Sequence, residues 1–472
     1  MIQDGGPPTA DGATLAAIAR GRALFNRADF WGSHEALEAA WLGAPEGSKP
    51  FLQGLIQAAA AFHKLIVQDN VHGARTLLDR ALARLGPAPE DPYGLAVRPL
   101  HAELTAWRLR LDAPLDADGH LRGLPRLEWS EAAQRRLVHV DRVALHRLEI
   151  GDARALLVAV TADGVTGWGE CRLAWNAYGA ADALGRALIP ALLAEGIASP
   201  SELPVHWQGV ARGRRAQAAL EAAVWDVFAR RAGTPLATYL GLRPRAVPLA
   251  ARIDVAEPLE LADAARRAVR DGFAQVVLPA RPNADRRVLP EVVRGLGAAV
   301  AFDLDGAYRR ADWYAIRAMA ALNPAFVWRP VPRDQLADMG RLRRWLGTPV
   351  GGGPYATEHA AADAHRLGAY DVLAVDPGQA GIGEALRMLD LAERLAVPAW
   401  IAGRAVTPIG ALADLAVAMH GAASLPADLG APAFVRPNAE RSMAPKAGAG
   451  IGWAPDGAWL AAHVREHETF VA

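Results

Sequence analysis

The sequence predicts an all-α helical bundle followed by an α/β part that closes into a barrel. Residues 1–112 carry apolar residues at helical spacing, without strand-like alternation. From residue 246, short apolar runs alternate with longer helical patterns, which is the rhythm of βαβ units and a parallel sheet. Seven or eight such units in about 180 residues fit a closed barrel better than an open sheet.

The helical bundle of residues 1–112 has the length of an ordinary domain. Its expected helices are Leu15–Phe25, His34–Trp41, Phe51–Ile66, Gly73–Leu85 and Leu100–Leu111. Residues 113–137 are rich in Pro, Gly and Asp and are predicted to be a linker.

Residues 138–245 open with strand-like alternation. Val140–Glu149, Ala155–Thr161 and Thr166–Cys171 are expected to form a small antiparallel sheet. A helix is expected over Arg215–Ala232, because Gly233 and Pro235 follow it. The run Arg212–Arg215 before it is typical of a solvated face, and its place near the barrel leaves a role in substrate binding open.

The barrel strands are expected between residues 246 and 435, and chemistry in such a barrel lies at the carboxyl ends of the strands. The expected strands are Val247–Val255, Gln275–Ala280, Val300–Asp305, Ala325–Val331, Pro349–Gly353, Val372–Asp376 and Pro398–Gly403.

Composition excludes several classes of protein. Lys+Arg and Asp+Glu are both 51, so the formal net charge is zero, which argues against binding to nucleic acid or to a membrane surface. No targeting segment and no apolar run of about 18 residues is present, so a cytoplasmic protein is expected. Cys171 is the single cysteine, which excludes a disulfide framework and a multi-cysteine metal site.

The basic residues are almost all arginine. The three lysines are Lys49, Lys64 and Lys446. A mechanism that requires a lysine between residues 65 and 445 is therefore impossible in this chain.

Several motifs of the second part occur together in a known order. They are Gly164–Cys171, Ala216–Asp226, Leu236–Gly241, Asp303–Tyr308 and Ser424–Gly430. With these motifs the chain resembles the enolase superfamily, in particular the o-succinylbenzoate synthases and N-acylamino-acid racemases of its muconate-lactonizing subgroup. The resemblance implies a modified (β/α)7–8 TIM-like barrel over residues 246–435 and an α+β capping domain over residues 138–245. It also implies a C-terminal segment, residues 436–472, that returns toward the cap.

The resemblance also implies a chemistry, the abstraction of a proton next to a carboxylate. A divalent metal, usually Mg²⁺, would hold the resulting enediolate through three carboxylate ligands, with a lysine on each side of the substrate. Oxygen ligands are required because Mg²⁺ is a hard cation.

Most of the family's functional positions are replaced here. Asp303 matches the first metal ligand, whereas the other two ligands fall on Trp328 and Gly353. The paired lysines of the second strand fall on Val277 and Pro279, and the opposing lysine falls on Asp376. A lone carboxylate is a poor Mg²⁺ site. We therefore expect no cofactor in the barrel, and Mg²⁺ only if the family's site is retained after all.

Charged residues near these positions suggest what the altered site does. Asp303 and Asp376 are expected to point into the barrel, close to four arginines. These are Arg281, Arg329, Arg333 and Arg404. One interpretation is that acid–arginine pairs only fill a vacated cavity. Another is an arginine-lined pocket for a small carboxylate ligand, with Trp328 as a stacking wall. A third makes Asp303 or Asp376 a metal-free general base, which needs a pKa raised by burial.

The helical part carries its own signature. The matching residues are Phe25-Asn26, Phe30-Trp31, His34–Trp41, Phe51–Gln57, Asn70 and Gly73-Ala74. They resemble the family called domain of unknown function 309 (DUF309). His34, Glu38 and Trp41 share one helix face, and His63 lies on the following expected helix, Phe51–Ile66. This arrangement is either a buried polar network or a Zn²⁺ or Fe²⁺ site made by His34, Glu38 and His63.

Three functional hypotheses follow. The first is a pseudoenzyme that has kept the barrel and binds a carboxylate. The second is a divergent lyase or isomerase that works without a metal through Asp and Arg. The third is a conventional Mg²⁺-dependent o-succinylbenzoate synthase or N-acylamino-acid racemase. The resemblance also implies a homo-oligomer.

Overall fold

The computed structural model describes residues 12–88, 92–113, 123–173, 178–194, 196–207, 213–255, 257–282, 289–296, 299–431 and 434–472. The chain divides into two compact units. The first comprises Met1–Asp141, Leu188–Ala211 and Ala472, and the second comprises Arg142–Ala187 and Arg212–Val471. Within the described ranges, no helix combines the length and the apolar character needed to cross a bilayer.

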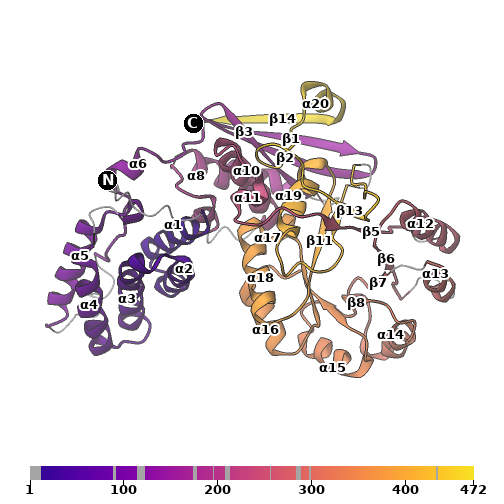
Figure 1. Ribbon diagram of the computed structural model, residues 1–472, viewed down its shortest axis with the longest axis horizontal. Helices are drawn as coiled ribbons and strands as arrows, with labels where there is room; N and C mark the ends of the chain where they lie inside the picture. The colour runs from indigo at the N-terminus through magenta and orange to yellow at the C-terminus, as the bar shows by residue number, and fades with distance from the viewer. Residues whose placement is uncertain are drawn as a thin grey trace, which may run out of the picture. The chain divides into compact units, whose positions relative to one another are not determined.

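The first unit is all-helical, as predicted (Figure 1). Its main helices are α1 (Gly12–Asn26), α2 (Phe30–Gly43), α3 (Lys49–Ile66), α4 (Val71–Leu85) and α5 (Val97–Arg110). Short helical turns are η1 (Glu46–Ser48), η2 (Pro92–Gly94) and α6 (Glu131–Gln134). The side chains of Asp29 and Asn70 cap α2 and α4 by accepting hydrogen bonds from the amides of Gly32 and Gly73. Leucines on the inner faces of these helices are buried and form the core.

The described part of the predicted linker, residues 123–137, is packed on this helical core. Leu127 and Trp129 are buried in it. The side-chain amide of Asn26 donates to the carbonyl of Leu127 (3.0 Å), and its carbonyl accepts from the amide of Leu127 (2.7 Å). This stretch is therefore part of the first unit, because its apolar side chains are needed to cover the helices.

The segment Leu188–Ala211, which the sequence boundaries put into the capping domain, belongs by its contacts to the first unit. It contains α8 (Ile189–Ala194), η4 (Pro200–Glu202) and α9 (Leu203–His206). Ile197 and Val138 exchange backbone hydrogen bonds of 2.8 and 2.9 Å. The hydroxyl of Ser201 donates to the carbonyl of Ala16 on α1 (2.6 Å).

The second unit begins with an antiparallel sheet in the order β14-β1-β2-β3, which lies across the top of this unit in Figure 1. The strands are β1 (Arg142–Ile150), β2 (Ala153–Ala162), β3 (Val165–Leu173) and β14 (Val464–Val471). The C-terminal segment thus returns to the cap as its edge strand. The helix α10 (Arg214–Arg231) packs so closely on β3 that a side chain at Gly169 would overlap the carbonyl of Ala219. The remaining elements are α7 (Tyr178–Ala183), η3 (Leu184–Leu188), α11 (Leu236–Tyr239) and α20 (Gly457–His463).

The barrel has eight parallel strands in the order β12-β11-β10-β9-β8-β7-β6-β5. Their bounds are β5 (Ala250–Arg252), β6 (Gln275–Pro279), β7 (Ala299–Asp303), β8 (Phe326–Trp328), β9 (Val350–Gly352), β10 (Val372–Val375), β11 (Ala399–Ala405) and β12 (Asp428–Gly430). Its first and last strands meet, because the amide of Ala250 donates to the carbonyl of Ala427 (2.8 Å). The predicted barrel is confirmed.

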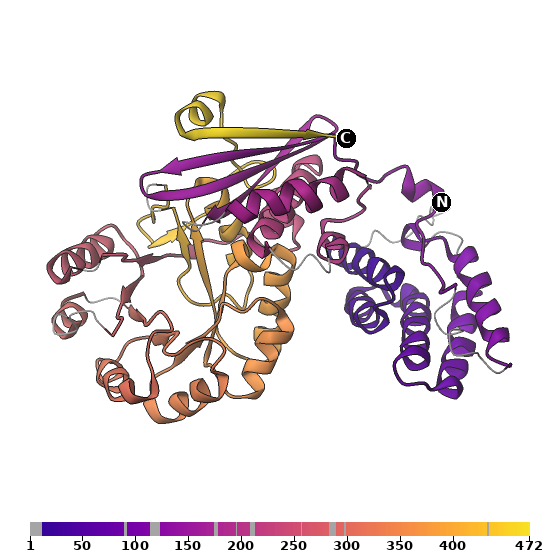
Figure 2. The same ribbon diagram turned by 180° about the vertical axis from the view of Figure 1, so that it is seen from behind.

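Helices form the outer layer of the barrel, and Figure 2 shows the same arrangement from behind. They are α12 (Pro258–Arg270), α13 (Leu289–Leu296), α14 (Trp313–Ala320), α15 (Leu336–Leu346), α16 (Glu358–Arg366), α17 (Pro377–Ala380), α18 (Ile382–Arg394) and α19 (Pro408–Ala418), with the short turn η6 (Arg310–Asp312).

Two details of the strands differ from the prediction. The run Val247–Val255 contains two strands, β4 (Val247–Pro248) and β5, and β4 pairs outside the barrel with β13 (Ser442–Met443). The eighth barrel strand, β12, is only three residues long and has no apolar run, so periodicity alone did not identify it.

Candidate functional site

Below its mouth, the barrel is filled by side chains. Trp328 of β8 and Trp400 of β11 are 2% and 0% exposed, and their rings meet edge to face at 4.8 Å between centroids. Val277 of β6 lies in the same buried cluster. Layers of inward side chains are usual in such barrels. These side chains leave the mouth as the place to look for a binding site in the barrel.

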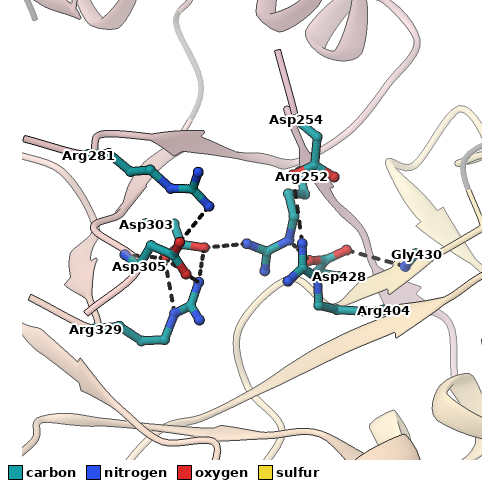
Figure 3. A network of polar contacts seen from close by, with 9 residues as sticks. All are labelled: Arg252, Asp254, Arg281, Asp303, Asp305, Arg329, Arg404, Asp428 and Gly430. Carbon is teal, nitrogen blue, oxygen red and sulfur yellow. Dashed lines mark hydrogen bonds and ion pairs between the residues drawn. The ribbon is translucent and has the colours of Figure 1, made fainter. Parts of the chain in front are cut away.

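Asp303 ends β7 and lies in register with Pro279 of β6 and Trp328 of β8. Both of its carboxylate oxygens accept hydrogen bonds from arginines. Arg252 Nη1 donates to Oδ2 at 2.7 Å, and Arg329 Nη2 donates to Oδ1 and Oδ2 at 2.7 and 2.6 Å. Figure 3 shows the carboxylate held between the two guanidinium groups.

Arg252, at the end of β5, was not among the residues expected from the sequence. Its side chain is 8% exposed and also donates from Nε to Asp428 Oδ2 at 2.8 Å, so it bridges two carboxylates (Figure 3). Its guanidinium carbon lies 4.9 Å from the ring centroid of Trp328. Burial would lower the pKa of Arg252, but the carboxylates of Asp428 and Asp303 raise it, so the group stays charged.

Arg329 and Arg281 complete this network on its outer side. Arg329 has a positive φ of 51°, which is rare for a residue with a side chain, and its guanidinium folds back over Trp328 at 4.1 Å. Asp305 pairs with Arg329 at 2.9 Å and with Arg281 at 2.5 Å. Arg281 is 66% exposed and lies at the outer end of the network (Figure 3).

The positions implied for a metal do not fit Mg²⁺ in this chain. The oxygens of Asp303 are already used by two guanidinium groups, and Trp328 has no oxygen in its side chain. At Gly353, φ is 90°, and a β-carbon would lie 2.7 Å from the carbonyl oxygen of Ala374. A metal ligand at this position would strain the backbone. The site therefore has too few free oxygen ligands for a hard cation.

A cavity of about 520 Å³ opens beside the network, within the range of small-molecule sites. Its polar lining includes Arg215, Arg329, Arg333, Asp376, Gln379 and Arg404. The predicted residues Trp328, Arg329, Gly353, Asp376 and Arg404 all line this cavity, whereas Arg281 does not. Trp328 offers little free surface, because Arg252 and Arg329 cover its ring and only a small part of the side chain is exposed.

Asp376 follows β10 and precedes α17, and it is 3% exposed. Arg215 Nη2 lies 3.6 Å from its Oδ2. Burial raises the pKa of Asp376, while Arg215 and Arg404 oppose that shift. The carboxyl group is thus protonated more readily than a solvated aspartate.

Arg404 is the penultimate residue of β11. Its Nη2 lies 3.8 Å from Oδ1 of Asp254, whose side chain is 72% exposed. Burial lowers the pKa of Arg404, and the positive charges of Arg252 and Arg172 lower it further. Sequence reasoning gave Arg215 little weight, because it belongs to a short basic run. In the structure Arg215 lies in the first turn of α10, and its side chain lines the cavity. Its place at the start of the expected helix was the feature of the sequence that could have identified it.

In the first unit, the predicted set of His34, Glu38 and His63 is not brought together as a ligand set. Among the described residues, the compact cluster is His34, Glu35 and Glu38, with one ligand atom of each within 4.8 Å of the others. His63 instead contacts Trp31, whose ring also stacks on His34 at 5.1 Å. The ring of Trp31 therefore contacts both histidines. Trp41 packs under Lys49, with the ammonium 5.2 Å from its ring.

The fold and the mouth of the barrel define a class of protein, the enolase-type barrel with an α+β cap. Family models agree: Mandelate racemase / muconate lactonizing enzyme, N-terminal domain, matches residues 134–241, and Enolase C-terminal domain-like matches residues 260–447. A third model, Domain of unknown function (DUF309), matches residues 18–77.

Individual relatives support the same assignment. The chain is 30% identical over 315 residues to an N-succinylamino acid racemase of Amycolatopsis sp, which covers 63% of this chain and 84% of that protein. It is 28% identical over 287 residues to an o-succinylbenzoate synthase of Geobacillus kaustophilus, covering 58% and 76%. A solved enolase-superfamily structure from Listeria innocua matches 71% of this chain and 99% of its own with a TM-score of 0.64 at 17% identity. The chain belongs to the enolase superfamily and carries an additional DUF309 region at its N-terminus.

Proposed function

We propose that the barrel is a pseudoenzyme, a carboxylate-binding protein that has given up metal-dependent proton abstraction. The observation that carries this proposal is the occupation of both oxygens of Asp303 by Arg252 and Arg329. A guanidinium group supplies the positive charge that a metal would supply, but it has no open coordination position for an enediolate.

The cavity next to this network supports binding of a small carboxylate. Its lining offers guanidinium groups that form two-pronged hydrogen bonds to a carboxylate, and apolar walls that would cover the rest of a ligand. The names of the relatives point to succinylated compounds and to o-succinylbenzoate, so these are the first ligands to test.

Calorimetric titration of the full-length chain with o-succinylbenzoate and with N-succinylamino acids tests the proposal. We expect binding of the same affinity in EDTA and in Mg²⁺, no binding of the dimethyl ester of o-succinylbenzoate, and no racemisation. Robust Mg²⁺-dependent turnover would contradict the proposal and support the conventional synthase or racemase. Absence of binding to every carboxylate tested would also refute it.

A second candidate is a metal-free lyase or isomerase, and the burial of Asp376 in the cavity favours it. A carboxyl group whose pKa is raised by burial is suited to proton transfer near neutral pH. This candidate predicts that N-succinylamino acids exchange their proton next to the carboxylate in D₂O and EDTA, and that the D376N variant loses the exchange. If the wild-type chain does not catalyse this proton exchange, the metal-free enzyme is refuted and the pseudoenzyme remains as the proposal.

A further inference from the structure

The charges around the cavity are distributed unevenly. At the ends of β12 and of β5 to β8, three arginines face three carboxylates in one connected network (Figure 3). The arginines are Arg252, Arg281 and Arg329, and the carboxylates are Asp303, Asp305 and Asp428. The charges of this side balance and each guanidinium group already pairs with a carboxylate, although Arg252 Nη2 is buried without a hydrogen-bond partner among the described residues. An incoming carboxylate would therefore meet no net positive charge here.

On the side of β10 and β11, two arginines line the cavity without a close ion pair to any described residue. Arg215 and Arg404 line the cavity here, and Arg172 acts on the same region. The carboxylate paired with Arg215 is the buried Asp376, at 3.6 Å. Asp414, which is also buried, interacts with Asp376 and Arg215, and burial raises the pKa of both carboxyl groups. Asp254, the carboxylate paired with Arg404, is 3.8 Å away and exposed to solvent, so it screens that charge weakly.

We infer that the carboxylate of the ligand binds between Arg404 and Arg215, where it competes with Asp376 for the guanidinium of Arg215. This inference rests on the proposed function and places the ligand at the opposite side of the mouth from Asp303. The remainder of the ligand lies along the apolar wall that Val331, Met339 and Tyr355 contribute to the cavity. The ligand class is therefore a carboxylate with an apolar body.

Competition with Asp376 follows from electrostatics. An ionised Asp376 beside Arg215 repels a second carboxylate, whereas a neutral side chain of the same shape does not. Arg333 lines the same cavity but is exposed to solvent, so loss of its charge should matter less. Loss of Arg404 or Arg215 should therefore weaken binding of the carboxylate, whereas loss of the charge of Asp376 should strengthen it.

The test is calorimetric titration of full-length variants with o-succinylbenzoate in EDTA. We expect R404Q and R215Q each to weaken binding at least about tenfold, as expected for a lost charged hydrogen bond. R333Q should lose less affinity than either, and D376N should bind about tenfold more tightly. The control, R341Q, changes an exposed arginine of α15 outside the cavity and should stay within about twofold. Circular dichroism establishes that each variant is folded, and Arg215, at the start of α10, provides a second test if R404Q does not fold.

The outcomes separate the two proposals. If the wild-type chain binds but R333Q carries the loss, or if D376N binds more weakly, the placement between Arg404 and Arg215 is overturned while carboxylate binding stands. If R404Q and R215Q bind like the wild type, the placement is equally overturned. If the wild-type chain binds no carboxylate, the proposed function and the placement both fall.

Discussion

Arg252 and Asp303 form an ion pair of 2.7 Å at the mouth of the barrel, although 51 positions separate them in the chain. Both side chains are largely buried, and Arg252 reaches on to Asp428. A guanidinium group thus lies among the carboxyl ends of the strands where relatives of this fold would be expected to hold a metal. The pair and its extension to Asp428 connect β5 with β7 and β12 at the mouth.

Replacement of Arg252 by Met should destabilise the barrel strongly. It leaves Asp303 and Asp428 buried with less compensation, and breaking a buried pair from one side costs about 3–5 kcal/mol. The measurement is the free energy of unfolding from urea titration followed by tryptophan fluorescence. The control is R281M, at the exposed end of the same network, which should cost less than about 1 kcal/mol. Equal losses for both variants would show that the bridge of Arg252 is not the stabilising element.

Addition of Mg²⁺ should leave the midpoint of thermal unfolding unchanged. A cation that bound the folded chain alone would stabilise it by RT ln(1 + c/Kd), where c is the free Mg²⁺ concentration, and would so raise the midpoint. Because both oxygens of Asp303 are occupied, we expect the same midpoint in millimolar Mg²⁺ and in EDTA. A rise that disappears in D303N would place a metal in the barrel, and one that disappears in H34A would place it at the cluster of the first unit.

The contribution of Asp414 to the free energy of unfolding should become less favourable as the pH rises. It is buried in α19, and burial raises its pKa well above the ordinary value, with Asp376 and Glu170 adding repulsion. The folded state therefore binds the proton more tightly than the unfolded state, and its stability falls as the pH rises from the ordinary carboxyl range through the folded pKa. Each tenfold difference in proton affinity is worth about 1.4 kcal/mol.

The variant D414N tests this pH dependence. Its stability relative to the wild type should improve between pH 5 and pH 8, since the asparagine has no charge to bury. Urea titrations at several pH values measure the difference. D152N, which changes an exposed aspartate in the turn between β1 and β2, is the matched control and should give a constant difference. A constant difference for D414N as well would disprove the assignment.

Asn26 should stabilise the packing of residues 123–137 on the helices of the first unit. Its side chain makes two hydrogen bonds with the backbone of Leu127, and their loss in N26A should cost about 1–3 kcal/mol of local stability. Hydrogen exchange at the amide of Leu127 should become faster. N70A, which removes the cap of α4, should leave exchange at Leu127 unchanged. Unaltered exchange in N26A would mean that Leu127 and Trp129 hold the segment by burial alone.

Much of the fold could be predicted because it depends on local patterns. The helix of Phe51–Ile66 and the strand of Gln275–Ala280 appear within two residues of their expected ends, since their apolar residues repeat with the period of each element. The short strand β12 escaped prediction, because it has no apolar run and exists through pairing with β11. Apolar periodicity likewise gave no sign that Leu127 and Trp129 belong to the helical core.

The site divides in the same way. The sequence by itself determined which groups are present: three lysines, none of them between residues 65 and 445, and no carboxylate at the positions of Trp328 and Gly353. Only the tertiary structure decided which groups meet. Closure of the barrel brings Arg252 of β5 between Asp303 and Asp428, and packing of the helices brings Trp31 against both His34 and His63. Composition limits chemistry through the atoms available, whereas ion pairs depend on distances that only the closed barrel sets.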